Sequence, residues 1–117
     1  KIQSALLNGS HVEDIVIGLP APRDIALDTS AGKLYWTSYH ANTIQRASLN
    51  GSQVEDVVTN LSFPRGIALD PSAGKIYWAE YNQGKIQRAL LDGSQVEDIV
   101  TGLRKPRYVA LHESAGQ

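Results

Sequence analysis

The chain has 117 residues, enough for one domain at most, and it contains no Cys, so disulfides and thiolate metal sites are excluded. Its 11 Lys and Arg residues balance 12 Asp and Glu residues without a basic run, which argues against a nucleic-acid partner. No apolar stretch approaches the ~20 residues that span a bilayer, and the first residues do not form a signal peptide, so no membrane insertion is expected.

A repeat of 42 residues runs through the whole chain without a gap. A fixed period of this length indicates a stacked or radial repeat architecture. The chain holds just under three copies. The repeated positions include glycines, valines, arginines and tryptophans: Gly9, Gly51 and Gly93; Val12, Val54 and Val96; Arg23, Arg65 and Arg107; Trp36 and Trp78.

One unit, taken in chain order from the second copy, is predicted to contain four short strands. The segment "RGIALD" (65–70) alternates small apolar residues and ends at the turn-forming "PSAG". The segment "KIYWAEY" (75–81) is aromatic and β-branched, and "KIQRALL" (85–91) alternates again before "DGS". Asp-Gly between two strand-like runs is typical of a hairpin, because both residues tolerate positive φ.

The fourth segment, "QVEDIVT" (95–101), has two interpretations. Ser94, Glu97 and Gly102 resemble an N-cap, its capping-box partner and a C-terminal glycine, and the apolar residues between them have helical spacing. The Val, Ile and Thr content and the hairpin turn just before it favour a strand. We predict a strand, whose Glu-Asp pair forms a solvated edge that discourages pairing with other sheets.

Four strands in about 42 residues make one propeller blade. We therefore predict an all-β fold, a β-propeller of four-stranded antiparallel blades with about three blades per chain. Residues 1–117 form a single propeller segment. In it, residues 1–17 supply two outer strands of a blade, residues 23–59 and 65–101 each form a full blade, and residues 107–112 supply the inner strand of a further blade.

Several stretches resemble the YWTD repeats of the low-density lipoprotein receptor family. "GKLYWTS" and "GKIYWAE" follow "PRDIALD" and "PRGIALD", and "IQRA", "GS" and "VED" come downstream, so the resemblance covers essentially the whole chain. It implies a closed six-bladed β-propeller, usually extracellular, that binds proteins and has no enzymatic activity. The Thr-Asp pair of the motif is Thr37-Ser38 in one copy and Ala79-Glu80 in the other, so the inter-blade contact of that Asp is not carried over.

Three such units make half of a six-bladed ring. Open sheet faces and edges at both ends lead to aggregation unless they are covered. We therefore expect either further repeats or a homodimer in which two chains complete the ring. The sequence stops at "SAGQ" (114–117), just before the aromatic strand of its last copy. Two interpretations stay open: the sequence is incomplete at this end, or one sheet at each junction lacks a strand.

Most residues that could carry chemistry have a structural interpretation. The Tyr-Trp pair of each unit is interpreted as blade-to-blade core rather than a platform for sugar, and Asp28 and Asp70 as turn caps. The 3 His residues fall at different phases of the repeat without metal-ligand spacing, and no Ser/His/Asp set is present. We predict no catalytic residue, no metal and no cofactor.

The candidate ligand-binding residues lie in the loops that join blades and in the loops after the Trp strand, on the face where propellers usually bind. Arg and Tyr recur there, and both types are enriched in binding hot spots. The repeated Arg has an equally good structural interpretation, in which it bonds carbonyls of a neighbouring blade. The candidates are Arg23, Asp24, Tyr39, His40, Arg65, Glu80, Tyr81, Asn82, Arg107 and Tyr108.

We predict a secreted or extracellular, non-enzymatic module that binds a protein partner through this loop face. The alternative is a lectin with weak glycan sites around the ring, strengthened by multivalency. A third class, a lactonase or hydrolase on a propeller scaffold, would need a convergent metal or acid/base cluster, which the sequence does not show. Sequons at Asn8, Asn50 and Asn60 make glycosylation and secretion plausible.

Overall fold

The computed structural model describes residues 2–4, 13–16, 22–38 and 41–107. These residues contain strands and turns, and no helix. It follows that the described part of the chain offers no helix with the length and apolar character of a membrane span. The strands are β1 (Ile2–Ser4), β2 (Glu13–Val16), β3 (Pro22–Asp28), β4 (Lys33–Ser38), β5 (Thr43–Ser48), β6 (Glu55–Val58), β7 (Pro64–Asp70), β8 (Lys75–Glu80), β9 (Lys85–Leu90) and β10 (Glu97–Val100).

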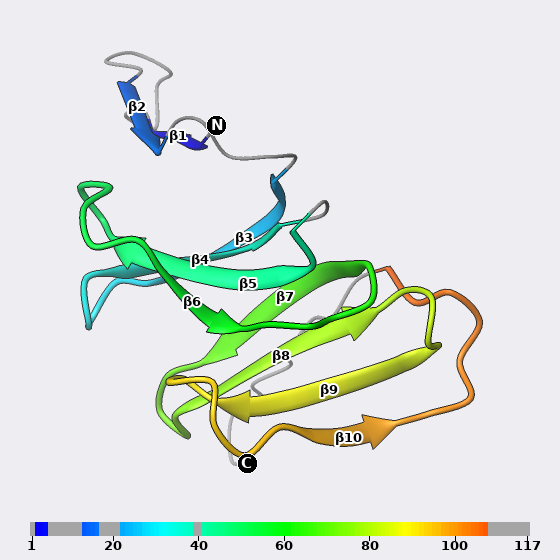
Figure 1. The fold of residues 1–117 in the computed structure, drawn as a ribbon. Coiled ribbons are helices and arrows are strands. Elements are labelled where there is room, and N and C mark those ends of the chain that lie inside the picture. The colour runs from blue at the N-terminus through cyan, green and yellow to red at the C-terminus, as the bar shows by residue number, and fades with distance from the viewer. Residues whose placement is uncertain (1, 5–12, 17–21, 39–40, 108–117) are drawn as a thin grey trace.

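The strands form two four-stranded antiparallel sheets and one two-stranded sheet. The four-stranded sheets have the orders β3-β4-β5-β6 and β7-β8-β9-β10, and β1 pairs with β2. Each four-stranded sheet follows the chain as a meander, which is the architecture of a propeller blade. Figure 1 shows the three sheets one after another, with β1 and β2 on the side of β3–β6 that faces away from β7–β10. The predicted all-β propeller fold is confirmed.

The two "VED" segments of these sheets are strands, as predicted, and not helices. β6 and β10 pair with β5 and β9, and each pairing contains one irregularity in register. In the turn before each of these strands, the side chain of the first turn residue, Asn50 or Asp92, accepts a hydrogen bond from the amide two residues later. The side-chain Oδ1 of Asn50 accepts a hydrogen bond from the Ser52 amide at 3.0 Å, and Asp92 accepts one from the Ser94 amide at 2.9 Å. Such an Asx turn reverses the chain between the two outer strands of each blade.

Each blade has two different faces, because side chains alternate along every strand. We call the face that carries Trp36 or Trp78 the Trp face, and the face that carries Tyr35 or Tyr77 the Tyr face. The Trp face of β7–β10 packs on the Tyr face of β3–β6 and forms the main core. Its buried members are Tyr35, Ile44, Val58, Ile67, Ile76, Trp78 and Ala89. The YW pair therefore serves as blade-to-blade core, as the sequence indicated.

The acidic pair of the outermost strand is exposed, as predicted for a solvated edge, and its carboxylates also bind side chains of their own sheet. Glu55 and Asp56 point to opposite faces of the sheet, and each has a partner there. On the Trp face, the Trp36 indole Nε1 donates to Gln45 Oε1 at 3.1 Å, and Gln45 Nε2 donates to Asp56 Oδ1 at 2.8 Å. The same chain of hydrogen bonds recurs in the next blade. The pair thus orders the side chains of both faces.

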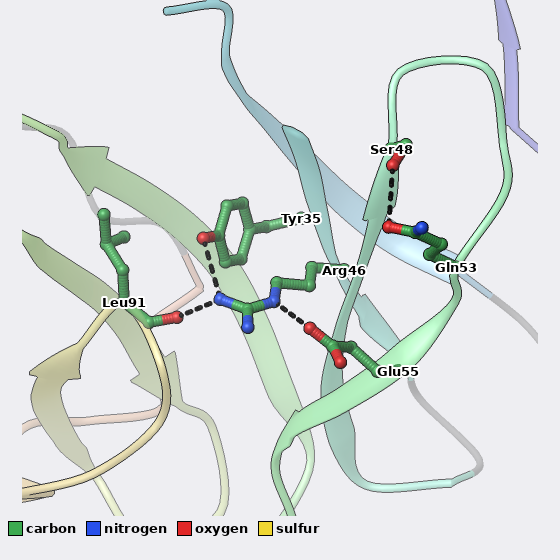
Figure 2. A network of polar contacts seen from close by, with 6 residues as sticks. All are labelled: Tyr35, Arg46, Ser48, Gln53, Glu55 and Leu91. Carbon is green, nitrogen blue, oxygen red and sulfur yellow. Dashed lines mark hydrogen bonds and ion pairs between the residues drawn. The ribbon is translucent and has the colours of Figure 1, made fainter. Parts of the chain in front are cut away.

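On the Tyr face, Arg46 connects the two blades (Figure 2). Its Nε donates to Glu55 at 2.5 Å within its own blade, and one terminal nitrogen lies 3.4 Å from the Tyr35 hydroxyl. The same terminal nitrogen donates to the Leu91 carbonyl of the next blade at 2.9 Å. A guanidinium suits this position, because its planar donors reach a carboxylate and a carbonyl at once.

A second polar contact between the blades involves Thr37 of the motif. Its hydroxyl donates to the Arg65 carbonyl at 2.8 Å and accepts from the Asp24 amide at 3.2 Å. The Asp24 carboxylate accepts from the Ile67 amide of the next blade at 3.0 Å. Thr37 and Asp24 thus form hydrogen bonds with backbone groups at the place where the inner strands β3 and β7 meet.

Gly93 provides a test of how closely the blades approach. It has φ +89, and a Cβ at this position would lie 1.9 Å from the Val57 carbonyl oxygen of the preceding blade. Gly74 has a similar φ, +69, with nothing within 4 Å of its Cβ position. Gly74→Ala should therefore cost only the left-handed backbone penalty, about 1–2 kcal/mol. Gly93→Ala must also push the blades apart.

We expect urea unfolding to show a clearly larger loss of stability for Gly93→Ala than for Gly74→Ala. The physical reason is the backbone carbonyl, which cannot turn away as a flexible side chain would. Equal losses for the two variants would show that the close approach of Gly93 to Val57 does not hold in solution.

Candidate functional site

Three connections meet at one end of the blade β7–β10. They are the β6–β7 connection, the β8–β9 turn (81–84) and the segment 101–107 that follows β10. The Tyr81 amide donates to the Phe63 carbonyl at 3.2 Å, and the Leu103 amide donates to the Gly84 carbonyl at 2.7 Å. A Cβ at Gly84 would lie 2.3 Å from the Leu103 carbonyl oxygen. Glycine thus allows the segment 101–107 to lie directly on the β8–β9 turn.

Three cationic side chains lie around the Tyr81 ring, one from the start of β7 and two from the segment 101–107. The Arg65 guanidinium carbon lies 4.6 Å from the ring centroid, and that of Arg107 lies 5.3 Å from it. The Lys105 ammonium lies 5.7 Å from the same centroid. All three distances lie within the range of cation–π attraction. We call Tyr81, Arg65, Lys105 and Arg107 the Tyr81 cluster.

The cluster carries positive charge, and no carboxylate of the described residues pairs with it. Within the part of the chain that the structure describes, the ion pairs are Arg46–Glu55, Lys85–Asp98 and Arg88–Glu97, and none includes a cluster member. The Arg65 Nε is buried, and no described group accepts its hydrogen. Three cations around one ring repel one another, so an anion placed among them would be attracted by all three.

A hollow of about 550 Å³ lies beside the cluster. Its lining combines the tyrosine ring, two amide side chains, two cations and one apolar side chain: Tyr81, Asn82, Gln83, Gly84, Leu103, Arg104 and Lys105. Asn82, Gln83 and Leu103 are exposed, so these side chains are available to a ligand. The hollow is large enough for one or two side chains of a partner, with polar groups that would orient them.

Arg65, Tyr81, Asn82 and Arg107, predicted as candidates, lie in this region. Their meeting has a simple cause: Arg65 is the second residue of β7, Tyr81 follows β8, and the Arg107 carbonyl accepts from the Gly66 amide at 2.6 Å. Among the described residues, no hydrogen bond from the Arg65 or Arg107 guanidinium to a carbonyl is present, and the Arg65 Nε has no acceptor.

Glu80, also a candidate, lies below the surface. Its side chain is buried, with 1% of the residue exposed, and its Oε2 accepts from the Ser62 amide at 2.8 Å. The other oxygen, Oε1, is buried without a hydrogen-bond partner in the described residues. Burial raises the pKa of this carboxyl above its ordinary value, although the Ser62 amide and Lys85 act in the opposite direction. Glu80 therefore supports the β6–β7 connection from beneath.

The other candidates fall in three groups. Asp24 is half-buried and holds the contact between inner strands, and Arg23 lies on β3. Asn50 and Asn60 of the sequons are exposed. Tyr39, His40, Tyr108 and Asn8 lie outside the described residues.

Sequence reasoning missed Arg104 and Lys105 as members of the site. They belong to "GLRKPRY" (102–108), a loop that joins blades, in which the sequence analysis named only Arg107 and Tyr108 as candidates. The available signal was the pair of adjacent cations, which the equivalent loops "GLPAPRD" and "NLSFPRG" lack. No group of three or more His, Cys, Asp or Glu side chains in the described ranges is arranged to hold a metal ion.

The two blades, their meander topology and their packing define a segment of a β-propeller. Residues 32–71 match the family "Low-density lipoprotein receptor repeat class B". The YWTD repeat predicted from the sequence is thereby confirmed. No curated protein matches the chain in sequence.

Solved structures share this fold. A structure described as a nidogen/laminin complex has 30% identity and a TM-score of 0.84, covering 91% of this chain and 42% of the other. Selenomethionine-substituted virginiamycin B lyase from Staphylococcus aureus has 22% identity and a TM-score of 0.68, and its inactive variant with quinupristin has 22% and 0.65. Each of these two alignments covers 91% of this chain and 36% of the lyase chain. At 22% identity, the similarity to the lyase shows the fold alone. The chain thus spans less than half the length of these proteins.

The buried Glu80 predicts a pH-dependent difference for Glu80→Gln. Because the folded state holds the proton of Glu80 more tightly than the unfolded state, the contribution of Glu80 to stability falls as pH rises through its raised pKa. Glutamine keeps an oxygen for the Ser62 amide and carries no charge.

We expect thermal unfolding at pH 7 to show a higher Tm for Glu80→Gln than for the parent chain, and a smaller difference below about pH 4, where the unfolded carboxyl is also protonated. A difference that is independent of pH would contradict the role of burial. Glu97→Gln, on the exposed outer strand, serves as the comparison.

Proposed function

We propose that the chain is part of an extracellular, non-enzymatic β-propeller module that binds a protein partner through its loop face, with the Tyr81 cluster in the site. The observation that carries this proposal is the convergence of Arg65, Lys105 and Arg107 on one tyrosine ring, where the described residues offer them no carboxylate partner. The cluster combines two residue types that are enriched in hot spots, Tyr and Arg.

The charge of the cluster favours an acidic segment of the partner. A carboxylate among the three cations would form charge-assisted hydrogen bonds, of which those to Arg can be bidentate. The neighbouring hollow offers Asn82 and Gln83 for the backbone amides of a peptide and Leu103 for an apolar side chain. The similarity to a structure of a nidogen/laminin complex supports a protein as the partner.

The repeat suggests a related subsite on the preceding blade. Arg23 and Tyr39 lie 42 residues before Arg65 and Tyr81, with Asp24 and His40 next to them. Arg107 is the same repeat position in the following unit, and Tyr108 stands next to it as Asp24 stands next to Arg23. We include these residues in the proposed loop face, and we assign Glu80 the role of holding the connection beneath it.

A glycan is the second candidate ligand, which would make the protein a lectin. The specific observation in its favour is the pair of amides, Asn82 and Gln83, beside the Tyr81 ring in an open hollow. A neutral sugar would depend on the ring and the amides and would respond little to the charge of Arg107. This difference separates the two candidates.

We also propose that the module is a secreted glycoprotein and that its blades belong to a six-bladed ring, completed by further repeats or by a homodimer. Exposed Asn50 and Asn60 support glycosylation, because both sequons are accessible. The Asn50 Oδ1 accepts from the Ser52 hydroxyl at 2.7 Å, and this contact does not use Nδ2, the atom that would carry a glycan.

Fluorescence polarisation with a labelled ten-residue polyglutamate peptide tests the acidic-segment proposal. Arg107→Glu should weaken binding about tenfold or more, because it removes one attraction and adds a repulsion, and tenfold corresponds to ~1.4 kcal/mol. Tyr81→Ala should also weaken binding, since the ring holds the cations in place.

The matched control is Lys75→Glu, which makes the same change in net charge at the opposite end of β8. Equal weakening by Lys75→Glu and Arg107→Glu would reduce the effect to overall charge and contradict a site at Tyr81. Binding of neutral glycans on an array, unchanged by Arg107→Glu and lost in Tyr81→Ala, would favour the lectin instead.

A further inference from the structure

The connections 59–63 and 101–105, which follow β6 and β10, have the same backbone shape. Two positions of each have a left-handed φ: Asn60 and Gly102 have +60 and +72, and Phe63 and Lys105 have +53 and +44. One backbone hydrogen bond anchors each connection on the preceding turn, at 3.0 Å in the first and 2.7 Å in the second. The Lys105 amide therefore corresponds to the Phe63 amide in conformation as well as in sequence.

The two amides differ in their hydrogen bonding. Asn42, at the end of the β4–β5 turn, accepts from the Phe63 amide through Oδ1 at 3.2 Å. The corresponding residue of the β8–β9 turn is Gly84, which has no side chain. Among the described residues, no group accepts from the Lys105 amide. This difference arises inside the described blade, because an acceptor equivalent to Asn42 would come from residue 84 itself.

The place that the Asn42 side chain takes in the first unit is open to a ligand in the second. Gly84 and Lys105 both line the hollow beside the Tyr81 cluster, and Lys105 is exposed. The Lys105 ammonium and the Arg107 guanidinium lie 5.7 and 5.3 Å from the centroid of the Tyr81 ring. A main-chain donor and two cations thus come from one short segment, 105–107.

A carboxylate suits this combination of groups. The oxygen that bonds the Phe63 amide belongs to a planar carboxamide on a short stem, and a carboxylate presents the same planar oxygen with a negative charge. A hydrogen bond from a backbone amide to a carboxylate is charge-assisted and roughly twice as strong as a neutral one. The side-chain cations attract an anion from many directions, whereas the main-chain amide gives the contact one fixed direction.

We propose that the Lys105 amide is the main-chain donor for a carboxylate of the bound acidic segment, which takes the place that Asn42 Oδ1 holds in the preceding unit. This donor deepens the proposed function and rests on it, because it names the atom that orients the acidic side chain. Gly84 determines specificity here, since any side chain with an oxygen at this position would occupy the donor. In the preceding unit Asn42 already occupies the corresponding amide, so that unit does not offer the same donor.

Fluorescence polarisation with the labelled ten-residue polyglutamate peptide tests the donor through Gly84→Asn and its matched control, Gly84→Ala. Both variants place a Cβ 2.3 Å from the present position of the Leu103 carbonyl oxygen, so both require the same shift of the connection. Only Asn adds an oxygen that can bond the Lys105 amide. We expect Gly84→Asn to bind the peptide about tenfold or more weakly than Gly84→Ala, as for the loss of a hydrogen bond to a charged group. Circular dichroism checks that both variants keep the fold.

An NMR titration of the isotope-labelled parent chain with the same peptide follows the donor without a substitution. The Lys105 amide proton should move downfield as it bonds a carboxylate, and the Phe63 amide, already bonded to Asn42, should stay nearly unchanged. A parent chain that binds the peptide without this shift, or equal affinities of the two Gly84 variants, would overturn the Lys105 donor and leave the proposed function standing. A parent chain that does not bind the peptide would overturn both.

Discussion

The packing of the Trp face of one blade on the Tyr face of its neighbour is the interaction on which this structure depends. A four-stranded sheet has two apolar faces and cannot bury either by itself. Trp78, Ile76 and Ala89 become fully or almost fully buried only because Tyr35 and Ile44 lie opposite them. An aromatic side chain such as Trp78 removes on the order of 200 Å² from water, so a few such contacts supply several kcal/mol.

Polar contacts set the relative position of the packed blades. Thr37, Asp24 and Arg46 each bond a backbone group of the following blade, and Gly93 lets its turn approach the Val57 carbonyl. These directional contacts fix the spacing of the sheets at both the inner and the outer strands. A rigid frame of this kind can hold loops in defined places, which is why the Tyr81 cluster can form from three separate connections.

The sequence identified part of the candidate site through its repeat. Arg65, Arg107 and Tyr81 stood out because each recurs or belongs to a recurring loop. That two arginines 42 residues apart would meet on one tyrosine was not predictable, because it depends on the path of segment 101–107 over the β8–β9 turn. Lys105 joins them for the same reason. Glu80 was expected at the surface and is buried, since the Ser62 amide draws it beneath the connection.

The sequence by itself determined the local structure. The 42-residue period, the alternation of the strands and the Asn-Gly and Asp-Gly turns define four strands per unit, because turn chemistry and side-chain alternation are properties of neighbouring residues. Only the tertiary structure decided which faces are covered. Val58 and Val100 follow nearly identical residues, yet one is buried and the other open. Burial requires a partner sheet, and no local pattern states whether that partner is present.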